Sequence, residues 1–121
     1  MPDSRDSILR RYASGERSFR GEDYHGEGPE RAWLDLREVD LSGADFSECY
    51  IQADFRDANL EGCRFEDANV KCSDFRGANL RNASFAKSAI DAAEFDGASL
   101  DGANFENAGA YGYTFKAGEL P

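Results

Sequence analysis

The chain repeats itself every five residues over most of its length. From Ala53 onward nearly every fifth residue is large and apolar, and the residue two places before it is nearly always small. Residues two apart on an extended segment point to the same side, so the small and the large residue both face inward. Inward positions at i and i+2 with a period of five do not match the roughly 3.6-residue period of an α-helix. The period therefore predicts a coil of short extended sides joined by corners.

This pattern resembles the repeat of the pentapeptide-repeat proteins, A-[D/N]-[L/F]-x-x. The segments 58–62 and 78–82, Ala-Asn-Leu-Glu-Gly and Ala-Asn-Leu-Arg-Asn, match it directly. The resemblance covers roughly four-fifths of the chain, a length that makes a chance match negligible. It implies an all-β fold, a right-handed quadrilateral β-helix, in which four repeats close each square turn and the turns stack as a solenoid.

The large residues follow a second pattern that suits four sides, because phenylalanine alternates with aliphatic residues. Phenylalanine would then fall on two opposite sides of the coil and stack on phenylalanine from turn to turn. Such stacks form a close-packed core without a ligand cavity. The predicted structural core comprises Phe55, Leu60, Phe65, Val70, Phe75, Leu80, Phe85, Ile90, Phe95, Leu100, Phe105 and Phe115.

The repeat reaches the N-terminal region with two irregularities. The step from Ile51 to Phe55 is four residues, which predicts one shortened corner. The segment 25–33 departs from the repeat and is interpreted as a loop inserted in the first coil. We expect a capping helix in residues 1–16, the β-helix in residues 17–116 with an inserted loop at about 25–33, and a short tail in residues 117–121.

The capping helix is predicted from residues 7–15. Apolar residues there follow helical spacings, Asp6 or Ser7 can act as the N-cap, and Gly15 is a C-terminal stop. Solenoids need such caps, because a bare end exposes core side chains and unpaired backbone groups. This helix and the segment 15–21 also resemble the opening of many cyanobacterial members of the family.

Charge and composition exclude several classes of function. The formal net charge of −10 opposes direct nucleic-acid binding and docking on anionic membranes. The apolar stretches fall far short of the ~20 residues that span a bilayer. The N-terminus lacks the pattern of a secretory signal, so a cytoplasmic location is expected, with organelle targeting as an alternative. The three cysteines suit neither a zinc site nor a disulfide scaffold, and no cofactor or metal is implied.

No catalytic residues are predicted, because a packed coil offers no concavity in which groups converge. Cys49 and Cys63 take the small inward position. Cys72 falls at a corner, where a more exposed and reactive thiol is the alternative to a buried one. Each outward Asp or Asn is expected to face solvent and to bond the turn that follows it. These residues are Asp45, Asp54, Asn59, Asn69, Asp74 and Asn79.

The remaining hypothesis is a non-enzymatic, monomeric module that binds or scaffolds an unidentified protein partner. Candidate partner-binding residues surround the predicted loop: Tyr24, His25, Pro29 and Trp33. For Trp33 an equal alternative is that it folds back over the first coil, and His25, the single histidine, also suits a solvated loop.

The resemblance implies a second function, an acidic DNA mimic that binds or inhibits a type II topoisomerase such as DNA gyrase. A basic girdle interrupts the acidity such a mimic needs: Lys71, Arg76, Arg81 and Lys87.

Overall fold

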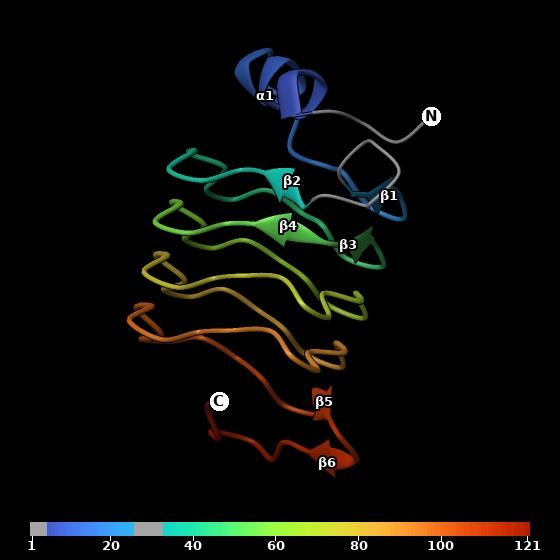
Figure 1. Ribbon diagram of the computed structural model, residues 1–121, viewed down its shortest axis with the longest axis vertical. Helices are drawn as coiled ribbons and strands as arrows, with labels where there is room; N and C mark the ends of the chain where they lie inside the picture. Colours follow the sequence, from blue (N-terminus) through green and yellow to red (C-terminus); the bar gives the residue numbers. More distant parts are fainter. Residues whose placement is uncertain (1–4, 26–32) are drawn as a thin grey trace.

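The computed structural model describes residues 5–25 and 33–121 as a stack of coils with one helix at its N-terminal end (Figure 1). The loop predicted between His25 and Trp33, with Pro29 in it, lies largely outside the described residues. The helix is α1 (Arg5–Ala13). The strands are short: β1 (Asp23–Tyr24), β2 (Leu34–Asp35), β3 (Tyr50–Ile51), β4 (Ala53–Asp54), β5 (Gly109–Ala110) and β6 (Tyr113–Thr114).

Parallel pairing between successive coils builds the solenoid. Strands β1 and β2 pair in parallel with β3 and β4, and single bridges carry the pairing onward along each side. One such column of bridges joins Ser18, Asp45, Arg64, Ser84 and Asn104. Asp40 pairs with Asn59, 19 residues later, whereas Asn59 pairs with Asn79, 20 residues later. The shortened corner predicted between β3 and β4 is therefore confirmed.

The outward Asp and Asn side chains stabilise the corners by hydrogen bonds. In each case a side-chain oxygen accepts a hydrogen bond from the backbone N–H two residues later, as Asn59 Oδ1 does from Glu61 at 3.2 Å. All six predicted residues make this bond: Asp45, Asp54, Asn59, Asn69, Asp74 and Asn79. The corners also need left-handed backbone, as at Gly77 with φ 72°, where a Cβ atom would collide with the side chain of Asp57.

Two columns of phenylalanine rings fill the interior. Phe65, Phe85 and Phe105 stack with ring centroids 4.8 and 4.7 Å apart, and Phe55 stacks on Phe75 at 5.1 Å. The two columns meet edge to face, as Phe75 and Phe85 do at 5.4 Å. Aliphatic residues occupy the other two sides, and Leu60, Val70 and Leu80 are fully buried with them. These columns leave the centre of the coils filled by side chains.

The C-terminal end departs from the simple stack that the repeat predicts. Strands β5 and β6 pair antiparallel, so the chain turns back after Ala110 instead of completing another coil. Phe115 therefore does not continue the column of Phe95. It lies against Phe105 with centroids 6.3 Å apart and rings tilted by 41°, and it is only partly buried. Phe95 and Leu100 are also partly buried, because no further coil in the described chain covers them.

Helix α1 packs on the opposite end of the stack. Ile8 is fully buried in the same core cluster as the phenylalanine columns. The Tyr12 hydroxyl donates a hydrogen bond to the carbonyl oxygen of Ser42 at 2.6 Å. The helix begins at Arg5, so Asp6 and Ser7 lie in its first turn rather than before it. It ends at Ala13, and Gly15 follows with φ 101°, the stop that the sequence predicts.

Candidate docking surface

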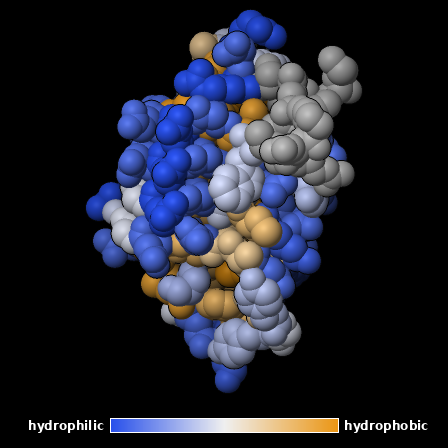
Figure 2. All heavy atoms as spheres, in the orientation of Figure 1, coloured by the Kyte–Doolittle hydropathy of each residue, from blue (hydrophilic) through white to orange (hydrophobic). Residues whose placement is uncertain are grey.

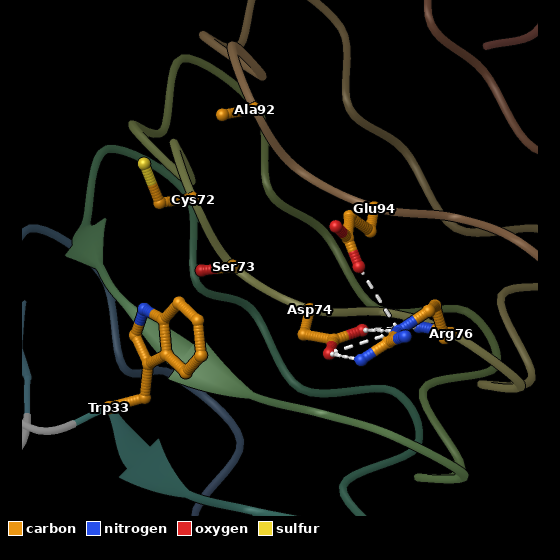
Figure 3. A pocket seen from close by; sticks show the side chains of 7 residues that line it. All are labelled: Trp33, Cys72, Ser73, Asp74, Arg76, Ala92 and Glu94. Carbon is orange, nitrogen blue, oxygen red and sulfur yellow. Dashed lines mark hydrogen bonds and ion pairs between the residues drawn. The ribbon is translucent and has the colours of Figure 1, made fainter.

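Trp33 lies on the surface immediately before β2, and half of it, 50%, is exposed. It forms one wall of a surface pocket of about 320 Å³, which we call the Trp33 pocket. Figure 3 shows its indole reaching from the residue before β2 toward residues of later coils. The pocket is lined by Trp33, Cys72, Ser73, Asp74, Arg76, Ala92 and Glu94. The surface therefore brings together an aromatic ring, a thiol and three charged side chains from three coils.

An alternating row of acids and arginines runs along this side of the solenoid. Each arginine bonds the acid of its own coil, as Arg56 does to Asp54 at 2.8 Å and Arg76 to Asp74 at 2.7 Å. Each also approaches the acid of the next coil, as Arg76 does to Glu94 at 3.1 Å. We call this row the arginine ladder, and its members are Asp35, Arg37, Asp54, Arg56, Asp74, Arg76 and Glu94.

The ladder changes the environment expected for its inner acids. The sequence places Asp54 and Asp74 in solvent, but both are buried, with exposed fractions of 9% and 6%. The arginines of their own and the preceding coil lie beside them and form ion pairs with them. The hydrogen bond from Arg76 lowers the pKa of Asp74, and that from Arg37 lowers the pKa of Asp35 to about 2. Asp35 and Asp74 are thus charged, and each is paired with an arginine.

The lowered pKa values predict an acid-sensitive contribution to stability. A carboxyl with a lower pKa in the folded state contributes stability above its unfolded pKa, about 3.9, and loses it as pH falls through the folded value. We expect the melting temperature, followed by circular dichroism, to fall between about pH 4 and pH 2. Replacing Arg76 with glutamine should flatten this fall, because the folded pKa of Asp74 then rises.

Arg81 provides the control for that experiment, since its guanidinium bonds the amide oxygen of Asn79 and, among the described residues, pairs with no carboxylate. Replacing Arg81 with glutamine should leave the slope of melting temperature against pH unchanged. Equal slopes for the Arg76 variant and the wild type would show that the ladder does not stabilise Asp74 as a carboxylate.

The three cysteines occupy different environments. Cys49 and Cys63 are buried, and their thiols donate hydrogen bonds to the carbonyl oxygens of Phe19 and Leu41 at 2.8 and 3.0 Å. Burial raises the pKa of Cys49 to about 11 and that of Cys63 to about 12. Cys72 is exposed in the Trp33 pocket. The inward and corner positions therefore differ in access to solvent.

Thiol labelling should separate these environments. At pH 8 we expect iodoacetamide to modify Cys72 alone in the folded protein, because buried thiols of raised pKa present little thiolate. All three cysteines should react in denaturant, and Cys72→Ser should abolish labelling of the native state. Mass spectrometry of tryptic peptides would count the modified sites. Labelling of Cys63 at the rate of Cys72 would contradict the packed interior.

The candidate residues around the predicted loop do not form one surface. Tyr24 is fully buried, and its hydroxyl donates to a carboxylate oxygen of Glu22 at 2.8 Å, so its side chain is unavailable to a partner. It occupies the large inward position of β1, a role that its repeat position already indicates. His25 is half-buried, and Pro29 lies outside the described residues. Trp33 remains as the exposed aromatic candidate, and the pocket beside it was not foreseen from the sequence.

Apolar surface is not confined to Trp33. Figure 2 shows a pale to orange strip that runs from the middle of the molecule toward its C-terminal end, between hydrophilic flanks. Tyr50, Tyr111, Tyr113 and Leu120 are further exposed large apolar residues. A second hollow, of about 290 Å³, is lined by Arg5, Asp35, Arg37 and Glu38. Because that hollow lacks an apolar wall, the Trp33 pocket is the better candidate for docking.

In residues 5–25 and 33–121, no group of three or more His, Cys, Asp and Glu side chains is arranged to hold a metal ion. Within the same residues, no helix has both the length and the apolar composition to cross a bilayer.

Comparisons with known proteins agree with the repeat and the fold. A search of curated protein sequences finds no match. QnrB1, a plasmid-mediated fluoroquinolone resistance protein, is 20% identical with a TM-score of 0.61, and the match covers 75% of this chain but only 47% of QnrB1. A pentapeptide repeat protein from Nostoc Pcc 7120 is 23% identical with a TM-score of 0.52, covering 98% of this chain and 90% of the other. These neighbours imply a right-handed quadrilateral β-helix.

The family itself is established at the level of sequence. The model of the pentapeptide repeat region matches residues 35–105, more than half of the chain. The matched segment contains the arginine ladder from Asp35 to Glu94 and most of the phenylalanine columns. The chain therefore belongs to the pentapeptide-repeat family.

Proposed function

We propose that this chain is a non-catalytic protein-binding module and that a partner docks at the Trp33 pocket. The observation that carries the proposal is the half-exposed Trp33 beside a pocket of about 320 Å³. Tryptophan is enriched among the residues that dominate binding energy at protein interfaces. Rigid solenoids characteristically present such residues on extended surfaces.

The chemistry of the pocket supports binding rather than catalysis. A general base needs a pKa near the working pH and a free lone pair toward the substrate. Asp74 accepts bonds from both Nε and Nη2 of Arg76, and these bonds lower its pKa. The phenylalanine columns fill the interior, so the described pockets lie on the outside of the coils. Pentapeptide-repeat proteins are generally structural or binding modules.

DNA mimicry is the less supported alternative. The acidity of the chain favours it, and QnrB1, which resembles this chain in fold, is a fluoroquinolone resistance protein. However, the chain spans only 47% of QnrB1. The predicted girdle places Lys71, Arg76, Arg81 and Lys87 within one coil length, and the arginine ladder adds Arg37 and Arg56. These positive charges interrupt the continuous acidic stripe that a duplex mimic requires.

The finer architecture is part of the proposal. We assign residues 1–16 to a cap, residues 17–116 to the right-handed β-helix with its loop at about 25–33, and residues 117–121 to a tail. Buried Ile8 and the Tyr12–Ser42 hydrogen bond support the capping role of α1. A covered N-terminal end leaves that end without a pairing edge, which favours a monomer. We propose a cytoplasmic location, because the N-terminus lacks the pattern of a secretory signal.

Partner capture tests the docking site. Immobilised wild type, Trp33→Ala and Tyr50→Ala would be exposed to lysate of the native host, and retained proteins identified by mass spectrometry. Tyr50 is a matched control, because it is 41% exposed on a different side of the coil. We expect a partner that the wild type and the Tyr50 variant retain and the Trp33 variant loses. Retention of the same partners by all three would refute docking at this pocket, and recovery of gyrase by all three would favour mimicry.

A further inference from the structure

We propose that the Trp33 pocket recognises an arginine side chain in an exposed segment of the partner protein. This inference rests on the proposed docking function and specifies the chemistry of the partner. Its basis is the place where the arginine ladder ends, inside the same pocket as the half-exposed tryptophan.

The arginines of the ladder occupy the same repeat position in each coil. Arg37, Arg56 and Arg76 each follow the large core residue of their side, namely Leu36, Phe55 and Phe75. In the next coil the residue after Phe95 is Asp96 instead of a fourth arginine. The pattern of alternating charge therefore stops at an acid, one coil after Arg76.

Glu94, the last acid of the ladder, has less positive charge near it than the inner acids Asp54 and Asp74. Asp74 lies near two arginines, with Arg76 at 2.7 Å and Arg56 at 3.8 Å. Among the described residues, Glu94 has an ion pair with Arg76 alone, and its side chain is 58% exposed. With Asp96 replacing the next arginine, this end of the ladder has a surplus of negative charge. A cation from a partner would supply the missing member.

Trp33 favours an arginine over a lysine as the cation that the partner supplies. A guanidinium can form a forked pair with a carboxylate while its planar face lies on an indole, whereas an ammonium acts as a point charge. The chain already has a guanidinium over an aromatic ring, since the guanidinium carbon of Arg17 lies 3.7 Å from the ring centroid of Tyr12. A pocket walled by Trp33 on one side and Glu94 on another therefore suits arginine. The net charge of −10 attracts a basic segment to it.

Fluorescence offers a direct test, because Trp33 is the single tryptophan of the chain. The wild-type protein would be titrated with the peptide acetyl-Gly-Arg-Gly-Arg-Gly-amide and with the same peptide carrying citrulline, the neutral isostere of arginine. We expect the arginine peptide to change Trp33 emission in a saturable manner that weakens with added salt. The citrulline peptide should bind about fivefold more weakly, near the upper limit for an exposed ion pair.

Variants locate the interaction. Glu94→Gln combined with Asp96→Asn should weaken binding of the arginine peptide about fivefold. Asp101→Asn removes a carboxylate that follows Leu100, on a different side of the coil, and should leave binding unchanged. The inference would be overturned if the two peptides bound equally or if neither changed Trp33 emission at any concentration. It would also be overturned if the Glu94 and Asp96 double variant and Asp101→Asn had equal effects on binding.

The captured partner separates this inference from the proposed function. One outcome is that Trp33→Ala loses the partner while the Glu94 and Asp96 double variant binds it normally. That outcome would support the docking site and contradict arginine recognition. A partner that the Trp33 variant still binds would reject the docking site itself.

Discussion

Replacing Phe85 with alanine is expected to lower the free energy of unfolding by about 3–5 kcal/mol, the usual effect of truncating a buried phenylalanine. Phe85 is fully buried, and its ring stacks between those of Phe65 and Phe105 at 4.8 and 4.7 Å. It also meets Phe75 and Phe95 edge to face. Truncation would leave a cavity bounded by rings that are fixed by their own coils. Urea unfolding followed by circular dichroism measures the change.

Phe95→Ala is the matched control. Phe95 stacks on Phe75 at 5.2 Å but is only partly buried, because the described chain adds no coil beyond it on that side. We expect its truncation to lower the free energy of unfolding by clearly less than that of Phe85. An unchanged unfolding midpoint for the Phe85 variant, or equal losses for both, would contradict the two stacked columns.

Replacing Ile8 with alanine is expected to lower the free energy of unfolding by about 2–5 kcal/mol. Ile8 is fully buried in the core cluster, although it belongs to α1 and not to the repeat. Its loss would remove the fully buried part of the apolar contact between the helix and the core, which Leu9 and Tyr12 share. If α1 caps the solenoid, the variant should also associate, because a loosened helix exposes a pairing edge and core side chains.

Sedimentation velocity measures that second effect and distinguishes a cap from ordinary packing. Arg10→Ala changes the same helix without removing a buried side chain, so it should remain as monomeric and nearly as stable as the wild type. Loss of stability in the Ile8 variant with no increase in association would show that α1 contributes packing but does not protect the end. Full stability of the variant would exclude both roles.

The sequence predicted the repeat, the shortened corner and the stacking of phenylalanine on phenylalanine, since these follow from local spacing alone. It placed Phe115 in the column of Phe95, because the period continues through residue 115. The pairing of β5 with β6 overrides that period and carries Phe115 to Phe105 instead. A turn back of the chain depends on contacts at the end of the stack, which the repeat pattern does not encode.

The candidate site was less accessible to sequence reasoning. Trp33 was identified as an exposed anchor or a residue folded over the first coil, but Cys72 and Glu94 lie far from it in sequence and meet it only through stacking. The arginine ladder had a detectable signal, because Arg56 and Arg76 follow phenylalanines one coil apart. Arg37 aligns with them only after the shortened corner is counted. Of the four residues of the predicted girdle, Arg76 alone belongs to the ladder, so the girdle does not indicate the pairing along this side.

Protection of Cys72 is the most direct test of docking at the Trp33 pocket. Cys72 lines the pocket and is the exposed one of the three cysteines. The measurement is the rate at which iodoacetamide modifies Cys72 with and without a saturating amount of the captured partner. Docking at the pocket predicts a rate at least about tenfold lower in the complex, with restoration of the free rate when Trp33→Ala prevents binding. An unchanged rate at Cys72 in a fully formed complex would place the partner elsewhere on the solenoid and contradict the proposal.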